Sequence, residues 1–242
     1  MSASTKQKRV LIIMSSEDRL GISGKKTGTW FEEVATPYYL LRESNIEVVF
    51  ASVNGGNAPI DQLSMQAPFT TENTDRFLSD YVAMTALQTT NKLSDINIDD
   101  FDALFFPGGY GLLWDLASDS RVINSIEQFY AKNKPIAMVC HAPAILRDAK
   151  KASGEPLAKG LTVTGFMNAE DDELDLSRHL LFSLEDTLRA QKANYQGTKV
   201  NWLAHIEEDG PLLTGQNPAS APLLTKHLVS FLNGDKQIRK QA

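Results

Sequence analysis

The chain has 242 residues, of which 42% are hydrophobic and 22% charged. This length allows one substantial buried core, and we expect a single domain over residues 1–242. The formal net charge of −6 argues against nucleic-acid binding, because that function needs a concentrated basic face. The negative charge is consistent with simple solubility.

Two features of the sequence bear on its location. The first apolar stretch, residues 10–14, is far shorter than a signal-peptide core or a membrane span, so we expect neither export nor a membrane anchor. The only cysteine, Cys140, has no partner for an internal disulfide, which favours a reducing compartment. The expected location is therefore the cytoplasm.

The first part of the chain predicts a strand, a helix and a second strand. Residues 9–16 (RVLIIMSS) form an apolar run ending in small polar residues, which is typical of a strand buried on both faces. Apolar residues recur at helical spacing over 29–43, where Pro37 must be accommodated by a kink or a break. Residues 46–53 (IEVVFASV) predict the second buried strand.

The next segment interrupts this alternation. Residues 55–68 are rich in Gly, Pro and polar residues and predict a loop. Residues 74–93 carry apolar side chains at roughly helical intervals but have no strand of their own. We therefore predict a cap insertion over about residues 57–93, containing one helix.

Strands and helices alternate through the rest of the chain. The segments that predict strands are FDALFFPGGYG (101–111, ending in a glycine turn), KPIAMVC (134–140), GLTVTGF (160–166) and PLLTGQN (211–217). The segments that predict helices are 122–134, 141–149, 176–191 and 218–234, the last closed by Gly234. A polar acidic loop is predicted over 169–176.

Repeated strand–helix units predict an α/β fold, an open doubly wound and mainly parallel sheet with helices on both faces. Ligands in such sheets bind at the carboxyl ends of the strands. The unusual polar segments SSED, PGGYG, CHAP and TGFMNAED all follow predicted strands. We expect them to meet in one crevice.

Cys140 lies where a predicted strand passes directly into a predicted helix, within IAMVCHAPAIL. This layout resembles a nucleophile elbow, in which a sharp turn lifts the reactive side chain above the sheet edge. The amides and dipole at the N-terminus of the helix would favour the thiolate. The alternative from these residues alone is a buried free cysteine beside a surface histidine, His141.

Two further features suggest chemistry at the same edge. The glycines of PGGYG (107–111) allow the backbone to approach a ligand and to direct an N–H at a developing oxyanion. The alternative is an ordinary turn. Glu33 stands on an otherwise apolar helix face, where it is either a solvated charge or a buried carboxyl group with a raised pKa, suited to acid–base chemistry.

Five segments in order closely resemble the ThiJ/PfpI superfamily, which has the flavodoxin-like, class I glutamine amidotransferase-like fold. They are FEEVATPYYLLRESNIEVVFASVNGG, KLSDINIDDFDALFFPGGYGLLWDL, IAMVCHAPAIL, LTVTGFMNAEDD and PLLTGQNPASA. The resemblance extends over about residues 10–231. It is greatest to the chaperone and glyoxalase III branch, which has a cap insertion and an adjacent Cys-His pair.

The resemblance implies a role for each matching residue. Cys140 matches the family nucleophile, and His141 matches the base that pairs with it. Glu33 matches the glutamate that bonds the thiol and transfers protons. The backbone N–H groups of Gly109 and His141 match the oxyanion site, and Gly108 belongs to the same substrate-binding loop.

The third catalytic acid matches the loop after Phe166, where spacing favours Asp171, with Glu170 as the near alternative. A plain solvated acidic loop over 170–172 is the other possibility. Family members of this branch usually carry a longer glutamate at the catalytic position. Tyr110, counted with the substrate-binding loop, and Ala142 also depart from the usual His and Gly.

The implied function is a cofactor-independent conversion of a 2-oxoaldehyde such as methylglyoxal to a 2-hydroxy acid such as lactate. One alternative is an amidase, protease or deglycase that uses the same cysteine. The other is a non-enzymatic stress chaperone or redox sensor. We expect no metal, because the four histidines lack ligand spacing, and no cofactor. The resemblance also implies that the protein is a homodimer. The partner molecule that it binds is expected to be a small reactive carbonyl substrate.

Overall fold

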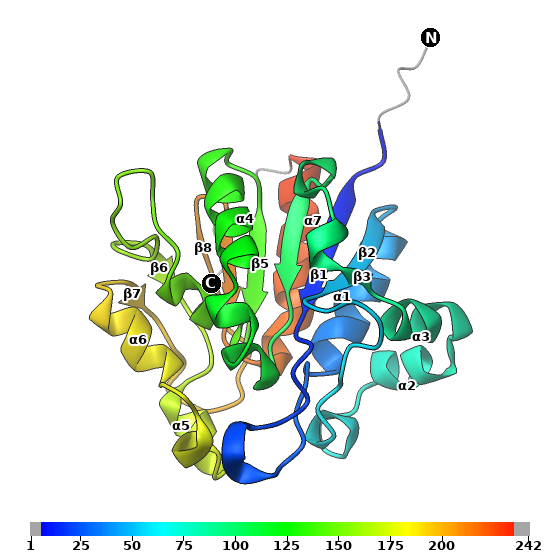
Figure 1. Cartoon of the computed structure of the whole chain (residues 1–242), viewed down its shortest axis with the longest axis horizontal. Coiled ribbons are helices and arrows are strands. Elements are labelled where there is room, and N and C mark those ends of the chain that lie inside the picture. The colour runs from blue at the N-terminus through cyan, green and yellow to red at the C-terminus, as the bar shows by residue number, and fades with distance from the viewer. Residues whose placement is uncertain (1–5, 235–242) are drawn as a thin grey trace.

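The computed structural model describes residues 6–234 and is built around a seven-stranded sheet of order β3-β2-β1-β4-β5-β9-β8 (Figure 1). A two-stranded sheet pairs β6 with β7. The strands are β1 (Arg9–Met14), β2 (Glu47–Ser52), β3 (Asn91–Lys92), β4 (Ala103–Phe106), β5 (Ile136–Val139), β6 (Thr162–Val163), β7 (Asn194–Tyr195), β8 (Ile206–Asp209) and β9 (Leu212–Gly215).

The large sheet is mainly parallel, as predicted. Its pairings are parallel from β3 to β9, and the edge strand β8 is antiparallel to β9. The central strands β1, β4 and β5 are buried almost without interruption, because both faces of the sheet are covered. The helices are α1 (Glu32–Glu43), α2 (Glu72–Ser79), α3 (Tyr81–Gln88), α4 (Ser120–Ala131), α5 (Asn168–Glu173), α6 (Leu184–Ala190) and α7 (Ala221–Asn233).

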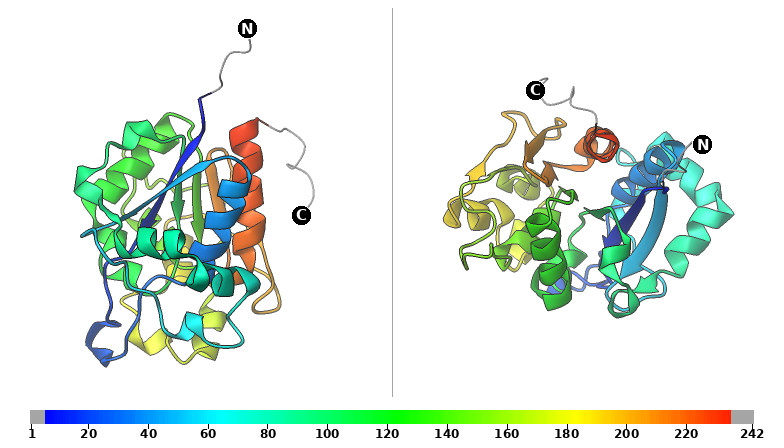
Figure 2. Two further views of the ribbon diagram at one scale, coloured as in Figure 1. Left: turned by 90° about the vertical axis from the view of Figure 1, so that its right-hand side faces the viewer. Right: turned by 90° about the horizontal axis from the view of Figure 1, so that it is seen from above.

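Helices cover both faces, which confirms the predicted fold class. The helices α1 and α7 lie side by side on one face and α4 lies on the other (Figure 2). The carboxyl ends of the parallel strands point toward the lower edge in Figure 1, where α5 also lies. None of the helices in residues 6–234 is long and apolar enough to cross a membrane.

The predicted cap helix over 74–93 is in fact two helices. The carboxylate of Asp80 accepts the N–H groups of Val82 and Ala83, so it caps a new helix, α3, and α2 ends just before it. The apolar pattern that suggested one helix includes side chains that face solvent, such as Tyr81, which is 83% exposed. The cap packs on α1 through α2.

Three other predictions differ from the structure. Residues 142–147 form a 3₁₀ helix, in which Ala144 donates to the carbonyl of His141 three residues back. The predicted acidic loop contains α5, since Glu170 and Asp171 are buried and hydrogen-bonded. Residues 176–191 divide into a 3₁₀ turn, Ser177–His179, and α6.

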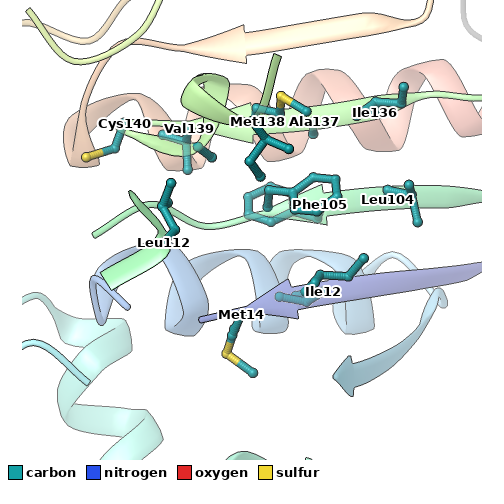
Figure 3. Packing of buried hydrophobic residues seen from close by; sticks show 14 of the residues in the cluster. Ile12, Met14, Leu104, Phe105, Leu112, Ile136, Ala137, Met138, Val139 and Cys140 are labelled. Carbon is teal, nitrogen blue, oxygen red and sulfur yellow. The ribbon is translucent and has the colours of Figure 1, made fainter. Parts of the chain in front are cut away.

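The main core leads directly to the candidate site. In Figure 3 the buried side chains of β5, including Ala137 and Val139, face those of β4, and Cys140 follows at the tip of the strand. The Cys140 sulfur lies beyond the end of the strand, near Leu112. A nucleophile at this position is attached directly to the buried core.

Candidate active site

Cys140 occupies the sharp turn that the sequence predicts. Its φ angle is 62°, in the left-handed region that is costly for a residue with a Cβ atom. Its N–H donates to the carbonyl of Gly215 at 2.9 Å, and its own carbonyl accepts the N–H of Phe166 at 2.9 Å. The surrounding backbone therefore enforces the strained conformation, which is a common feature of functional residues.

His141 is the neighbour of Cys140 in space as well as in sequence. Because the chain turns between them, the Cys140 sulfur lies 3.4 Å from His141 Nδ1. On its other side, His141 Nε2 lies 3.1 Å from Oδ1 of Asp171. His141 is only 1% exposed, so the alternative of a surface histidine is wrong.

Asp171, and not Glu170, contacts the histidine. Oδ1 of Asp171 also accepts a hydrogen bond of 3.0 Å from the hydroxyl of Tyr110. Burial and the charge of Asp171 raise the pKa of Tyr110 well above its usual value, so the hydroxyl keeps its proton. With a proton on Nε2, His141 donates to Asp171 and leaves Nδ1 free to accept the thiol proton.

Glu170, the alternative candidate for the third catalytic acid, instead connects separate segments of the chain. It is fully buried, and its carboxylate accepts the backbone N–H of Met167 and of Trp202 and the side-chain amides of Gln216 and Asn217. Glu170 thus joins α5 to the segment before β8 and to the end of β9. The alternative of a plain solvated loop is wrong for Glu170 and Asp171, which are both buried.

Glu33 is a buried acid beside the nucleophile, and the alternative of a solvated charge is wrong. Its side chain is fully buried, and Oε2 accepts the N–H of Gly108 at 2.5 Å. Burial raises the pKa of Glu33 to about 8, although hydrogen bonds from Gly108 and the Cys140 thiol partly oppose the rise. Near neutral pH this carboxyl group is mostly protonated.

The two glycines after β4 are required by close packing. A Cβ atom on Gly108 would lie 2.6 Å from Cβ of Cys140. Gly109 has a φ of 101°, and a Cβ atom there would lie 2.2 Å from the carbonyl oxygen of Gly28. The N–H groups of Gly109 and His141 act on the Cys140 thiol and lower its pKa. The N–H of Gly108 is occupied by Glu33, so Gly109 presents the donor of this loop.

The resting state of Cys140 is a thiol, which corrects the expected thiolate. Burial and the nearby charges of Glu33 and Asp171 raise its pKa well above the usual value, and the N–H groups of Gly109 and His141 oppose this only in part. The segment that follows is a short 3₁₀ helix and not the α-helix whose dipole was expected to lower the pKa. The thiolate must therefore form as the substrate reacts.

The sequence analysis assigned no role to two aromatic residues, Phe166 and Trp202, that lie near the catalytic histidine. The ring centroids of Phe166 and His141 are 4.5 Å apart. The ring centroids of Trp202 and Phe166 are 5.6 Å apart. The signal for Trp202 was a lone tryptophan in the polar segment GTKVNWLAH. Within residues 6–234 no group of three or more His, Cys, Asp and Glu side chains is arranged to hold a metal ion.

Comparisons with known proteins found relatives over most of this chain. The DJ-1/PfpI family model matches residues 27–230. The chain is 30% identical over 222 residues to the glutathione-independent glyoxalase HSP31 of Saccharomyces cerevisiae, covering 88% of this chain and 93% of that protein. A Francisella tularensis structure, Rapid Encystment Protein 24 kDa, has a TM-score of 0.88 and 34% identity, covering 93% and 99% of the two chains. The crystal structure of glyoxalase III from Candida albicans has a TM-score of 0.84 and 27% identity, covering 92% and 96%.

The family model spans the cap and the residues of the candidate site, from Glu33 to Asp171. The comparisons confirm the resemblance to the ThiJ/PfpI superfamily and its glyoxalase III branch that the sequence motifs predict. By its motifs, its fold and its family match, this chain belongs to the DJ-1/PfpI family.

Proposed function

We propose that this protein is an enzyme that converts a 2-oxoaldehyde such as methylglyoxal to a 2-hydroxy acid such as lactate, without glutathione, metal or redox cofactor. The observation that carries the proposal is the chain of contacts from the Cys140 sulfur through His141 to Asp171, with the buried acid Glu33 beside the thiol. This arrangement provides a nucleophile, a base and a second proton carrier.

The first step is addition of the thiol to the aldehyde. The Cys140 proton passes to Nδ1 of His141 while the sulfur bonds to the aldehyde carbon, and Asp171 stabilises the imidazolium that forms. The oxygen of the aldehyde gains the electron pair of the carbonyl bond. The N–H groups of Gly109 and His141, which lower the pKa of the Cys140 thiol, would stabilise that oxyanion.

The second step moves hydrogen within the substrate. His141 first returns the thiol proton to the oxyanion, which gives a neutral hemithioacetal. The ionised form of Glu33 then takes the proton from the first carbon and returns it to the second carbon through an enediol, while the hydroxyl proton moves from the first oxygen to the second. The hemithioacetal thereby becomes the thioester of a 2-hydroxy acid. No electrons enter or leave the substrate. Glu33 suits this transfer because a pKa of about 8 lies close to neutral pH, where an acid gives up and regains a proton with similar ease.

The last step is hydrolysis. Water adds to the thioester carbonyl, the carbon–sulfur bond breaks, and the departing sulfur regains its proton as the hydroxy acid leaves. The overall reaction adds one water molecule to the 2-oxoaldehyde. We also propose that the protein acts in the cytoplasm as a homodimer.

The test is lactate formation from methylglyoxal, without glutathione and after treatment with a metal chelator, by the wild type and by Cys140→Ser. We expect turnover by the wild type and a loss of at least about a thousandfold in the variant. A folded wild type without turnover would overturn the proposal. Amine release from glycated peptides would then favour the hydrolase, and client protection by Cys140→Ser would favour the chaperone.

A further inference from the structure

A series of aromatic rings connects the catalytic histidine to the surface. Beyond Phe166 and Trp202, the ring of Phe69 lies 6.0 Å from Trp202, and the ring of Trp30 lies 5.0 Å from Phe69. Phe69 belongs to the cap and Trp202 to the segment between β7 and β8. The series therefore joins two parts of the chain that are distant in sequence, and it reaches His141 through Phe166.

The members of this series differ in exposure. Trp30, Phe166 and His141 are each at most 2% exposed, as is Cys140. Phe69 and Trp202 are partly exposed. On the side of β4, the backbone of Gly108 already packs against Cys140, with no room for a Cβ atom. The two partly exposed rings are thus where the aromatic surroundings of the nucleophile meet solvent.

The conformation of Trp202 is strained and is held in place. Its φ angle is 66°, which is unusual for a large side chain. The backbone N–H of Trp202 donates to Oε1 of Glu170 at 2.8 Å. The side-chain amide of Asn217 donates both to that carboxylate and to the backbone carbonyl of Leu203. Strain that the surroundings enforce is a reason to look for a function.

We propose that Phe69 and Trp202 form an aromatic wall that contacts the substituent on the second carbon of the substrate, so that the site favours 2-oxoaldehydes with an aromatic substituent, such as phenylglyoxal. Glu170 is a positioning residue that holds Trp202 in this wall. The inference rests on the proposed function, because the substrate must be one that reacts at Cys140. Flat apolar rings pack well against a phenyl group and gain little from a methyl group.

The test uses alkylation of the single cysteine, which is independent of turnover. Phenacyl bromide and bromoacetone each transfer a 2-oxoalkyl group to sulfur, with formation of a carbon–sulfur bond and loss of bromide. They differ in a phenyl against a methyl group. Intact-protein mass spectrometry gives the alkylation rate for each reagent. Both rates are proportional to the fraction of Cys140 that is ionised, so this fraction cancels when one rate is divided by the other. The same ratio for N-acetylcysteine corrects for intrinsic reactivity.

We expect the corrected phenacyl preference of the wild type to be about fivefold, and to fall toward one in Trp202→Ala, Phe69→Ala and Glu170→Gln. Tyr81→Ala, which removes an exposed ring from α3, should leave it unchanged. Trp202→Leu keeps apolar volume without the ring and should also lose the preference, which covers the case in which Trp202→Ala does not fold. A wild-type ratio equal to that of N-acetylcysteine would overturn the inference.

Turnover measurements separate this inference from the proposed function. With both correct, kcat/KM for phenylglyoxal relative to methylglyoxal falls in Trp202→Ala in step with the alkylation ratio. An alkylation preference without turnover of either aldehyde would sink the proposed function and keep the wall as a binding surface for aryl carbonyl compounds. Turnover of methylglyoxal together with a corrected alkylation ratio of one would support the proposed function and contradict the aromatic wall.

Discussion

Tyr110 bonds the same carboxylate oxygen of Asp171 that contacts His141. An aspartate is one methylene shorter than the glutamate expected at this position, yet it reaches Nε2 of His141 at 3.1 Å. The Tyr110 hydroxyl shares Oδ1 of the same carboxylate, and its ring lies 4.4 Å from the imidazole. Tyr110, in place of the usual histidine, therefore supports the orientation of Asp171 from the oxyanion loop.

Asp171→Asn should change two observables in opposite directions. Turnover should fall by about 10²–10⁴-fold, because an amide neither fixes the required tautomer of His141 nor stabilises the imidazolium. Alkylation of Cys140 by iodoacetamide near pH 8.5 should become faster, because loss of the Asp171 charge lowers the pKa of the thiol. The two rates are followed by lactate formation and by intact mass. A parallel fall in both would indicate damage to the site as a whole, and Tyr110→Phe, which keeps the charge, should not speed alkylation.

Gly109→Ala should lower both activity and stability. The new Cβ atom would lie 2.2 Å from a backbone oxygen, and the φ of 101° is unfavourable for alanine, so the loop must move. We expect a loss of about 2–4 kcal/mol in the free energy of unfolding and at least about a hundredfold in turnover. Urea denaturation and the lactate assay measure these.

A matched control for Gly109→Ala is Gly210→Ala. Gly210 has a φ of 61°, but nothing lies within 4 Å of a Cβ atom there. Its cost should be limited to the backbone conformation, about 1 kcal/mol, with turnover unchanged. Equal effects of the two substitutions would show that steric contact in the oxyanion loop is not what makes Gly109 necessary.

At the scale of elements, local pattern predicted the central strands and the turn at Cys140, and failed where distant partners decide. The apolar runs around residues 10–14 and 136–139 are strands because both sheet faces are covered. The acidic segment after Phe166 looked like a loop, and α5 forms there with Glu170 bonded to residues more than 30 positions away. No local spacing shows such partners. For the same reason the sequence could not show whether Glu33 is buried, because its hydrogen-bond partner Gly108 is distant in sequence.

Several polar contacts join the cap to α1, and the contact made by Thr71 can be tested. The hydroxyl of Thr71 donates to Oε2 of the buried Glu32 on α1 at 2.5 Å and also accepts the N–H of Thr74 at the start of α2. Thr71→Val keeps the shape and removes both bonds. We expect a loss of about 1–3 kcal/mol in the free energy of unfolding and faster hydrogen exchange in α2.

The control for the cap is Thr89→Val at the end of α3, where the exposed hydroxyl bonds only the carbonyl of Thr85 among the described residues. Its effect should stay within about 0.5 kcal/mol. Thr71→Val should also raise the pKa of Glu32 further, because burial already raises it and the Thr71 bond lowers it. Unchanged exchange in α2 would mean that the remaining contacts of the cap hold it without the Thr71 hydroxyl.

At the scale of the molecule, the site lies close to the point where the strand order reverses. The chain proceeds from β1 outward to β2 and β3, and then returns to β4 on the other side of β1. Parallel sheets leave a crevice at the carboxyl ends of the strands at such a point. Gly108 and Gly109 follow β4 and Cys140 follows β5, the next strand. Glu33, from the first turn of α1, reaches them from the helical layer.

Burial of Glu33 should make the stability of the whole fold depend on pH. The pKa of Glu33 rises from 4.5 to about 8 on folding. Between these values the unfolded chain has released a proton that the folded protein still holds, so this group lowers the free energy of unfolding as pH rises from about 4.5 to 8, with no further change above. Relative to a neutral side chain, the total loss is on the order of 5 kcal/mol.

Glu33→Gln removes this titration and keeps the side-chain shape. The free energy of unfolding of the variant minus that of the wild type should therefore increase steadily from pH 5 to pH 8. Other titrating groups, such as the buried Asp61 and Asp115, contribute equally to both proteins and cancel in the difference. Urea denaturation at pH 5, 6.5 and 8 measures it, and Glu72→Gln, at an exposed position, controls for the loss of one carboxyl group. A difference that stays flat across this range would mean that Glu33 ionises as it does in the unfolded chain, and the proton carrier of the second step would then have to be His141.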